Sequence, residues 1–401
     1  MLRTPPSSTA NSPFECFAIA APGLEPLVAG ELAALGERPR VEAGGVAWDG
    51  DAASLYRANL WLRTASRVLV RAARFRARTF YELERHARRI PWERFVAPGS
   101  AVRFRVTCRK SRLYHSDAVA QRMAAAIEHR LGAASAYTAG ETPGDDETAD
   151  AGREQLFVVR LVHDECTVSA DASGALLHLR GYRQAVAKAP MRETLAAALL
   201  LAAEWRGDTP VLDPMCGSGT LPIEAALMAR DMAPGLRRQF ACADWPGFPR
   251  DVVAAVTADA EARIRPASAV AILGSDRDAG AIDAARANAE RAGVAADVSF
   301  SVRAISAIEP PPGPGLVVAN PPYGIRVGER HEVRNLYAQL GHVLRRHCAA
   351  WRVALLSADE KLTAQLGFPM RGVVATSNGG IPVRMEVGEV PSAPEPTKIY
   401  F

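Results

Sequence analysis

Four consecutive residues, Asn320, Pro321, Pro322 and Tyr323, carry the most specific chemistry in this sequence. They follow an apolar run at 317–319, which predicts a buried strand that ends at a loop, because neither proline can donate a backbone N–H to a sheet. The Asn320 carboxamide and an outward-pointing Pro321 carbonyl offer two hydrogen-bond acceptors, and Tyr323 offers a flat ring. Such a set suits the exocyclic amine of a planar base. We predict that these four residues are catalytic, with an ordinary Asn-Pro turn as the alternative.

A glycine-rich turn at 211–220, reading V-L-D-P-M-C-G-S-G-T, is the second stretch with chemical meaning. Asp213 ends a predicted strand, and the two glycines let a ligand approach the backbone, where any Cβ would collide. The N-terminus of the following helix favours an anionic group. The turn is no P-loop, and Pro222 stands where the third glycine of a dinucleotide fingerprint would fall. The residues expected to bind a cofactor here are Asp213, Pro214, Cys216, Gly217, Ser218, Gly219 and Thr220, of which Cys216 is expected to be a small packing residue.

Asp276 ends the next predicted strand, where a carboxylate can accept hydrogen bonds from both hydroxyls of a ribose. Arg277 follows it as a further candidate cofactor residue, whereas Asp278 is expected to cap the next helix. In a doubly wound sheet the glycine-rich turn, Asp276 and Asn320 all lie at the carboxyl ends of strands, around one crevice. This order predicts a nucleoside-type cofactor beside an amine substrate.

Basic residues are concentrated at positions 61–130, which hold 17 Arg and Lys against 5 Asp and Glu, although the net charge of the 401-residue chain is only +4. This concentration indicates a polyanionic partner. Solvated Arg-rich helix faces are the alternative, since the chain contains 44 Arg and only 4 Lys.

Within that basic segment, a loop at 108–117 combines cations with two aromatic rings in front of a helix that we expect Ser116 to cap. Such a surface suits phosphates and stacked bases, with a solvated turn as the alternative. The RNA-binding residues predicted here are Arg109, Lys110, Arg112, Tyr114 and His115.

Six cysteines are scattered along the chain without a C-x-x-C pair, which predicts neither a metal site nor a disulfide framework. A reducing cytoplasm is therefore the expected location. The Ser/Thr/Pro-rich residues 1–13 lack the apolar core of a signal peptide or membrane span, and we expect a disordered tail. No membrane and no metal partner is expected.

The order of apolar and polar residues predicts a small α+β unit near the start and, from about position 191, alternating helices and strands. That alternation favours a parallel sheet covered by helices. Residues 133–154 are expected to be a flexible insertion, 176–179 a strand and 231–268 a second insertion. The helices expected in the second half are 195–205, 220–229, 279–292 and 333–347.

The motifs at 213–220 and 320–323 resemble those of class I S-adenosylmethionine-dependent methyltransferases that act on exocyclic amines. The segments 108–115, 171–183 and 189–200 resemble bacterial THUMP-domain RNA methyltransferases, which make N(2)-methylguanine in large-subunit ribosomal RNA. The resemblance implies S-adenosyl-L-methionine as cofactor, with Thr194 and Asn320 as further contacts. The α/β domains that it implies are a tail (1–13), a ferredoxin-like unit (14–75), a THUMP RNA-binding domain (76–172), a linker (173–190) and a class I methyltransferase domain with a seven-stranded, Rossmann-like sheet (191–401).

The sequence departs from that family at Arg303 and Ala304, where members usually carry an acid that contacts adenine. The function that the resemblance implies is methyl transfer to the exocyclic amine of a guanine in RNA, with 23S rRNA the foremost substrate. The alternatives are a tRNA guanine-N(2) or DNA amine methyltransferase, and a non-catalytic RNA-binding factor of ribosome assembly.

Overall fold

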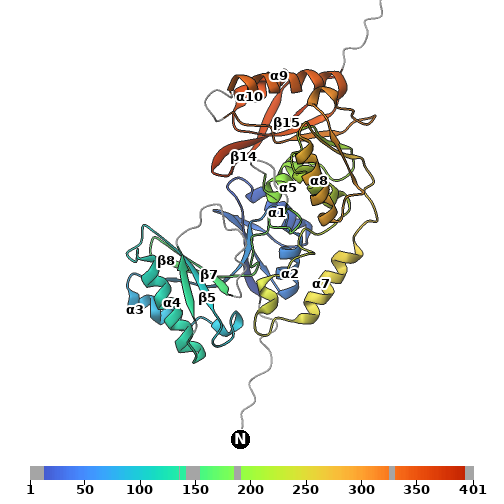
Figure 1. The fold of residues 1–401 in the computed structure, drawn as a ribbon. Coiled ribbons are helices and arrows are strands. Elements are labelled where there is room, and N and C mark those ends of the chain that lie inside the picture. The colour runs from blue at the N-terminus through green and yellow to red at the C-terminus, as the bar shows by residue number, and fades with distance from the viewer. Residues whose placement is uncertain (1–12, 135, 141–153, 185–190, 325–329, 393–401) are drawn as a thin grey trace, which may run out of the picture. The chain divides into compact units, whose positions relative to one another are not determined.

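The computed structural model describes residues 13–134, 136–140, 154–184, 191–324 and 330–392. Within these residues the chain forms two compact units, each organised around its own sheet (Figure 1). The described residues of unit 1 lie within 13–20, 28–177 and 238–259, and those of unit 2 lie within 21–27, 178–237 and 260–392.

Unit 1 contains one eight-stranded sheet with the order β2-β3-β1-β4-β8-β7-β5-β6. The antiparallel pairing of β4 with β8 joins strands of the predicted ferredoxin-like unit to strands of the predicted THUMP domain, so one sheet runs through both. In β5, Val102, Phe104 and Val106 are buried, in agreement with their period of two. The strands are β1 (Phe14–Ile19), β2 (Arg40–Glu42), β3 (Gly45–Gly50), β4 (Arg67–Arg76), β5 (Val102–Arg109), β6 (Tyr137–Gly140), β7 (Gln155–Val162) and β8 (Glu165–Asp171).

A buried ion pair between Arg67 of β4 and Asp171 of β8 fixes the middle of this sheet. Both side chains are at most 3% exposed. The Asp171 carboxylate also accepts hydrogen bonds from the backbone N–H of Ser173 at 3.0 Å and of Gly174 at 3.1 Å. Burial raises the pKa of the Asp171 carboxyl, and the Arg67 charge opposes that rise. Removing one partner would leave an uncompensated buried charge, which destabilises a fold by about 3–5 kcal/mol.

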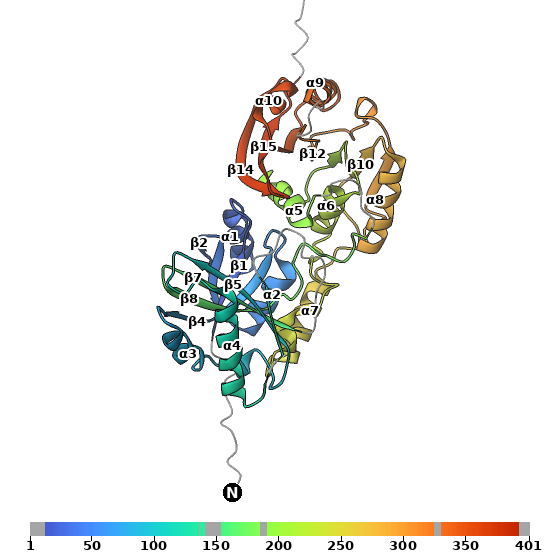
Figure 2. The same cartoon turned by 60° about the vertical axis from the view of Figure 1, so that its left-hand side comes forward.

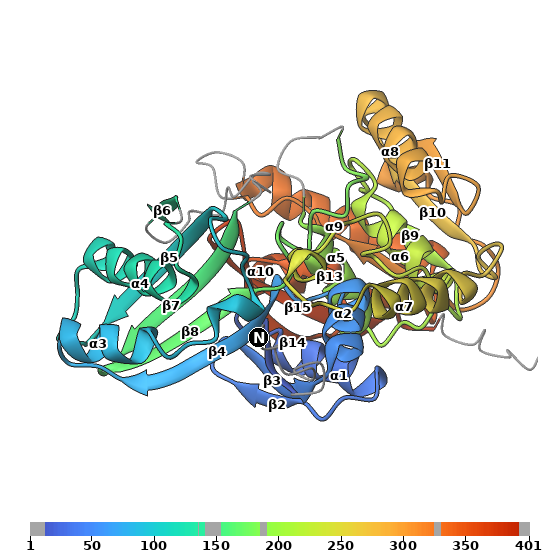
Figure 3. The same ribbon diagram turned by 90° about the horizontal axis from the view of Figure 1, so that it is seen from below.

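Helices α3 and α4 contact each other and lie against β4 and β5 respectively (Figure 3). Residues 238–259 complete unit 1, because the Trp245 indole donates to Gln155 Oε1 at 2.7 Å and its ring contacts those of Phe14 and Phe95. The helices up to position 262 that lie wholly or mostly in unit 1 are α1 (Glu25–Ala34), α2 (Ala52–Trp61), α3 (Phe80–Ala87), η1 (Trp92–Arg94), α4 (Ser116–Leu131), η2 (Ala241–Asp244) and α7 (Arg250–Ala262).

Unit 2 contains a seven-stranded sheet with the order β11-β10-β9-β12-β13-β15-β14, in which β15 alone runs antiparallel to the other described strands. This topology confirms the α/β fold class and the seven strands that the resemblance implies. The strands are β9 (Val211–Asp213), β10 (Ile272–Asp276), β11 (Val298–Val302), β12 (Leu316–Ala319), β13 (Arg352–Ser357), β14 (Met370–Asn378) and β15 (Ile381–Glu389).

Two groups of helices cover this sheet. Helices α5, α6 and α8 contact one another in series, and α8 lies along β10 and β11 (Figure 2). Helix α9 packs on β12 and β13, where Val317, Ala319, Val353 and Leu355 share a core with Leu340. The helices of unit 2 are α5 (Glu193–Ala202), α6 (Thr220–Ala229), α8 (Ala279–Ala292), η3 (Ile305–Ala307), α9 (Arg330–His347), α10 (Glu360–Thr363) and η4 (Ala364–Leu366).

Several elements agree closely with the sequence-based expectation. Helices α6 and α8 have the predicted bounds. The side chain of Asp278 caps α8, accepting hydrogen bonds from the backbone N–H of Gly280 at 2.9 Å and of Ala281 at 3.3 Å. These two helices follow the strands that carry the predicted cofactor residues.

Other expectations are wrong. Residues 176–179 form no strand, because Leu177 N–H donates to Ser66 O and the Arg238 guanidinium donates to Leu176 O. Of the flexible insertion expected at 133–154, residues 137–140 form β6, which pairs in parallel with β5. The insertion predicted at 231–268 is not contradicted, and it contains α7. Ser116 is the first residue of α4, and its neighbour His115 occupies the cap position without a side-chain bond. Most of the predicted tail, and 185–190 of the predicted linker, lie outside the described residues.

The space around two helical glycines predicts opposite effects of substitution by alanine. Gly341 lies where α9 packs on η4, whereas Gly30 lies in α1. A Cβ at Gly341 would lie 2.1 Å from the Leu366 carbonyl oxygen, whereas a Cβ at Gly30 in α1 meets nothing within 4 Å. We expect Gly341→Ala to lower the free energy of unfolding by about 1–3 kcal/mol through overpacking. Gly30→Ala should raise it by about 0.5–1 kcal/mol through helix propensity. Denaturant unfolding measures both values, and a stabilised Gly341 variant would contradict this packing.

Candidate functional site

Three neighbouring strands of unit 2 bring the predicted site residues to one edge of the sheet. Strand β9 pairs in parallel with β10 on one side and with β12 on the other. Asp213 ends β9, Asp276 ends β10 and Asn320 directly follows β12. Because the carboxyl ends of parallel strands meet at the same edge, these three residues lie at one edge of the sheet.

A hydrogen bond ties the glycine-rich turn to the neighbouring strand end. Gly217 N–H donates to Asp276 Oδ2 at 3.0 Å, and Asp278 N–H donates to Asp276 Oδ1 at 3.0 Å. Each carboxylate oxygen keeps a second lone pair, so the half-buried Asp276 can still accept two hydroxyl donors. Gly217 has a φ of +53°, and an added Cβ would meet nothing within 4 Å. Bare backbone facing open space beside a carboxylate fits a ribose-containing ligand.

The other residues of the turn are packed more deeply. Gly219 has a φ of +85°, and an added Cβ would lie 2.9 Å from the Ala285 Cβ, so no other residue fits there. The Ser218 carbonyl accepts a hydrogen bond from the buried Asn288 side chain at 3.0 Å. Burial raises the pKa of the Cys216 thiol well above its usual value, in keeping with a packing residue. Within 214–220, the buried residues are Pro214, Cys216, Ser218, Gly219 and Thr220.

Asp213 is a buried acid at the centre of the site. Its side chain is 1% exposed, and Oδ1 accepts the Met215 N–H at 3.0 Å. Burial raises the pKa of the Asp213 carboxyl to about 8, the Met215 bond opposes the rise, and the charge of Asp276 adds to it. The carboxyl is therefore largely protonated at pH 7, which limits the negative charge at this strand end.

Thr194 lies in α5 and is 8% exposed. The residue before it, Glu193, forms an ion pair with Arg183. Glu193 is 3.1 Å from the Arg183 guanidinium, which also donates to the Met191 carbonyl at 2.8 Å. Burial raises the pKa of the Glu193 carboxyl to about 7. Arg277 is exposed and directly follows Asp276, and its role as a cofactor contact stays a prediction.

A second buried cluster fixes the preceding segment on α6, and the sequence reasoning missed its acid. Tyr182 OH donates to Glu224 Oε1 at 3.0 Å, and Arg180 Nε lies 3.7 Å from the same oxygen. The Glu224 side chain is fully buried. The Arg291 guanidinium donates to the Tyr182 carbonyl at 2.8 Å. The only sequence signal was the Arg-Gly-Tyr-Arg stretch itself, because a lone glutamate on a helix ordinarily faces water.

The departure at Arg303 and Ala304 leaves no carboxylate at the two positions that directly follow β11. Arg303 N–H donates to the Asp276 carbonyl at 2.9 Å, and its guanidinium pairs with Glu309 at 2.6 Å. Ala304 is exposed. Val302, the last residue of β11, is 50% exposed although it is apolar. An exposed apolar side chain next to Asp276 offers a surface for a planar ring, and the sequence reasoning did not single it out.

Asn320 and Tyr323 form a hydrogen-bonded pair that extends to a third residue. Tyr323 OH donates to Asn320 Oδ1 at 2.6 Å, and the Asn378 amide donates to Tyr323 OH at 3.0 Å. Burial raises the pKa of the Tyr323 phenol to about 12. Pro321 is buried and Pro322 is exposed. One lone pair of Asn320 Oδ1 is thus used to fix the carboxamide, and the second remains available to an amine.

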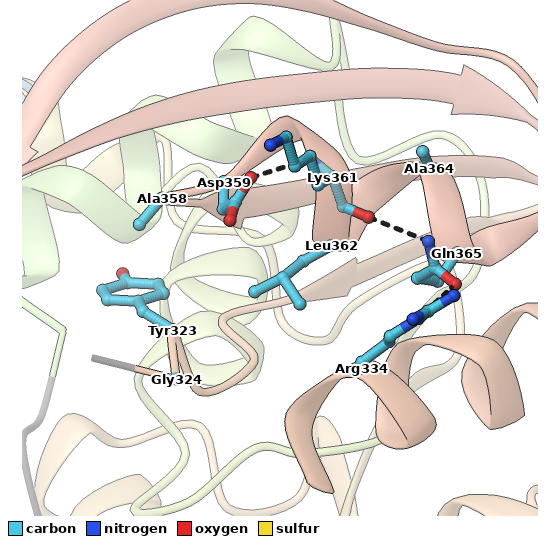
Figure 4. Close-up of a pocket in the computed structure, with 9 residues that line it drawn as sticks. All are labelled: Tyr323, Gly324, Arg334, Ala358, Asp359, Lys361, Leu362, Ala364 and Gln365. Carbon is cyan, nitrogen blue, oxygen red and sulfur yellow. Dashed lines mark hydrogen bonds between the residues drawn. The ribbon is translucent and has the colours of Figure 1, made fainter. Parts of the chain in front are cut away.

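Asn378, at the end of β14, was missed by the sequence reasoning because it lies 55 positions from Tyr323. A cavity of about 680 Å³ opens beside the Tyr323 ring (Figure 4). Such a volume is within the range of small-molecule sites. Its lining residues are Tyr323, Gly324, Arg334, Ala358, Asp359, Lys361, Leu362, Ala364 and Gln365.

The five predicted RNA-binding residues are all exposed, and they lie together in unit 1. Arg112 N–H donates to Asp164 Oδ1 at 2.8 Å, which holds the loop against the β7–β8 turn. The rings of Tyr114 and His115 have centroids 4.1 Å apart, and Tyr114 is 69% exposed. The loop therefore presents cations beside a pair of exposed rings.

Among the described residues, no group of three or more His, Cys, Asp or Glu side chains is placed to hold a metal ion. None of the helices in the described ranges has the length and apolar character needed to span a bilayer.

Comparison with known proteins identifies the family. A family model described as "RMKL-like, methyltransferase domain" matches residues 180–382, and a model described as "RlmL ferredoxin-like domain" matches residues 15–69. The first match covers half of the chain. The fold and the site thus define a class I methyltransferase, and the chain belongs to the RMKL-like methyltransferase family.

Relatives of similar sequence support this membership. The Synechocystis sp. protein slr0064, named "Putative RNA methyltransferase", is 34% identical over 91% of this chain and 94% of its own. The ribosomal RNA large subunit methyltransferase K/L of Syntrophotalea carbinolica is 36% identical over 94% of this chain but only 53% of its own, so this chain spans about half of that relative. The crystal structure of SMU.472 complexed with SAH is 29% identical, has a TM-score of 0.82 and covers 96% of this chain and 99% of that chain.

The raised pKa of Asp213 predicts how stability depends on pH. In the folded chain the carboxyl holds its proton up to about pH 8, whereas in the unfolded chain it loses the proton near pH 4. Unfolding therefore releases a proton between these values, and the free energy of unfolding falls as the pH rises through this window. Asp213→Asn should remove that part of the fall.

Thermal unfolding from pH 5 to pH 8 compares wild type with Asp213→Asn, and exposed Asp208→Asn is the control. The melting temperature of the Asp213 variant should fall less with pH than that of wild type or control. Parallel curves for all three proteins would show that Asp213 ionises normally.

Proposed function

We propose that this protein transfers a methyl group from S-adenosyl-L-methionine to the exocyclic N2 amine of a guanine in RNA, with 23S rRNA the foremost substrate. The observation that carries the proposal is the shared edge of β9, β10 and β12. There the Gly217–Asp276 pair and the Asn320–Tyr323 pair end neighbouring strands. The names of the relatives, an RNA methyltransferase and a large-subunit ribosomal RNA methyltransferase, point to RNA as the substrate.

S-adenosyl-L-methionine supplies an electrophilic methyl group on a sulfonium. In the proposed arrangement Asp276 accepts the ribose hydroxyls, the backbone at Gly217 borders the ligand, and Val302 offers an apolar face to adenine. Thr194 and Asn320 are further contacts that the resemblance implies. SMU.472, which shares this fold, was solved with SAH.

On the substrate side, the chain has to orient an amine that is a poor nucleophile, because its lone pair is delocalised into the purine ring. Hydrogen bonds from the amine to Asn320 Oδ1 and to the Pro321 carbonyl favour pyramidal nitrogen, which develops only in the transition state. The chain is also proposed to accelerate the reaction by holding the amine in line with the methyl group and by excluding water from the site. Tyr323 is proposed to stack on a base extruded from its helix.

No covalent nucleophile is required. Cys216 is the cysteine of the glycine-rich turn, and burial raises the pKa of its thiol well above the usual value. A buried neutral thiol is a weak nucleophile. A methyltransferase that attacks a carbon of cytosine through a thiolate is therefore disfavoured.

Unit 1 is proposed to bind the RNA. We keep the division into a ferredoxin-like unit at 14–75, a THUMP domain at 76–172, a linker at 173–190 and a methyltransferase domain at 191–401 as a proposal. The proposed RNA contacts of unit 1 are Arg109, Lys110, Arg112, Tyr114 and His115. The cytoplasm, where ribosomal RNA is modified in bacteria, is the proposed location.

The reaction is tested with tritiated S-adenosylmethionine, unmodified 23S rRNA transcript and mass spectrometry of the nucleosides. We expect N(2)-methylguanosine, and we expect Asn320→Ala to lower the rate by about 100-fold or more, as loss of a transition-state hydrogen bond does. Asn335→Ala, which changes an exposed asparagine of α9, is the control and should react normally. A methyl group on adenine, cytosine or DNA would refute the proposal, and tRNA in place of 23S rRNA tests the alternative substrate. Unchanged activity in Asn320→Ala would remove Asn320 from the mechanism.

The exposed cationic loop predicts the salt dependence of RNA binding. Changing Arg109, Lys110 and Arg112 together to Glu should weaken binding and flatten the plot of log K against log salt by roughly 0.7 for each phosphate that the loop no longer neutralises. A variant with Arg109→Lys and Arg112→Lys keeps the charge and should keep the slope. If the reversed loop retained the wild-type slope, another surface would hold the RNA.

A further inference from the structure

The cavity beside Tyr323 contains a carboxylate that no part of the proposed mechanism uses. Asp359 follows β13, the strand next to β12, and its side chain is one of those that line the cavity (Figure 4). It is half-buried. The carboxylate thus belongs to the same sheet edge as Asn320 and shares a cavity with the ring of Tyr323.

Hydrogen bonds hold Asp359 in a fixed position. Oδ1 accepts the Lys361 N–H at 2.8 Å, and the Asp359 backbone N–H and carbonyl both bond the Ser357 hydroxyl, at 3.3 and 3.2 Å. The buried Thr363 hydroxyl donates to the same Ser357 oxygen at 3.0 Å. Within the described residues no donor reaches Oδ2, which leaves an acceptor for a ligand in the cavity.

The remaining walls suit a planar base with a phosphate nearby. The Tyr323 ring and the Leu362 side chain offer apolar surface. Arg334 Nε donates to Gln365 Oε1 at 3.0 Å, and the Gln365 amide donates to the Lys361 carbonyl at 3.0 Å. The cavity therefore combines a stacking face, two cations and a single carboxylate.

A carboxylate can distinguish guanine from the other bases that carry an exocyclic amine. Guanine has an N1–H donor directly beside its N2 amine, whereas adenine and cytosine present a ring-nitrogen lone pair beside theirs. An ionised carboxylate only accepts hydrogen bonds. It therefore binds the N1–H of guanine and is repelled by the ring-nitrogen lone pair of adenine or cytosine. We propose that Asp359 is a specificity-determining residue that accepts the N1–H of the target guanine while Asn320 and Pro321 hold its N2 amine. This inference rests on the proposed function.

Capping of the short helix α10 is the competing role for Asp359. Asp359→Asn separates the two roles, because asparagine caps helices as well as aspartate does but lacks the charge and the second acceptor oxygen. Asp359→Ser is a second neutral variant that keeps a capping group. Glu360→Gln removes the neighbouring charge, which pairs with Arg384 and does not line the cavity, and serves as control.

The experiment uses a synthetic RNA hairpin that carries the nucleotide methylated in the 23S rRNA transcript. In a second hairpin that guanosine is replaced by 2-aminopurine riboside, which keeps the C2 amine but lacks N1–H. Wild type and Glu360→Gln should methylate guanosine with a kcat/KM about 100-fold or more above that for 2-aminopurine. In both Asp359 variants the guanosine value should fall by about 10- to 100-fold and the ratio should approach one.

Binding of S-adenosylhomocysteine, measured by calorimetry, should be unchanged in both Asp359 variants and shows that unit 2 is folded. A ratio that stays at the wild-type value in both variants overturns the role of Asp359, while the proposed function stands. A wild-type protein that puts no methyl group on guanine N2 in the transcript overturns the proposed function itself.

Discussion

The site depends on one constraint, the parallel alignment of three neighbouring strands that end at the same edge of the unit 2 sheet. Strand β9 is only three residues long, so its pairing with β10 and β12 leaves little freedom in where the glycine-rich turn begins. The hydrogen bond from Gly217 to Asp276 then joins the turn to the end of β10. The proposed binding of the cofactor and the proposed orientation of the amine both require this edge to be formed.

Buried ionisable groups hold the segment that precedes α5 against helices α5 and α6. Glu224 on α6 and Glu193 on α5 are almost wholly inaccessible, and each lies beside an arginine of the segment that precedes α5. Buried pairs of this kind add little net stability, but removing one partner is strongly destabilising. We infer that they specify how this segment packs against α5 and α6.

Much of the fold could be predicted from sequence because local patterns determined it. Helices α6 and α8 follow strand ends marked by Gly-Ser-Gly and by the capping Asp278, and their bounds were predicted correctly. Helix α2 could not be found in this way, because Ser54, Leu55, Tyr56, Ala58, Asn59 and Leu60 are all buried, which leaves no clear polar face. Strand β6 carries exposed side chains and is defined by its backbone pairing with β5, which a sequence pattern does not record.

The candidate site shows the same division. Four site residues could be recognised from sequence because each is a polar residue at, or shortly after, the end of an apolar run. They are Asp213, Asp276, Asn320 and Tyr323. Asn378, Asp359 and Glu224 carry no such local signal, and their positions depend on tertiary packing. Arg277 was selected only as the neighbour of Asp276, and because it is exposed its predicted contact with a cofactor stays a prediction.

A crystal structure of this protein with S-adenosylhomocysteine bound tests the central claim most directly. We predict that the Asp276 carboxylate accepts the ribose hydroxyls, that the backbone at Gly217 lies against the ligand, and that the sulfur faces Asn320. A ligand bound away from the ends of β9 and β10, or a sulfur that points away from Asn320, would contradict the account.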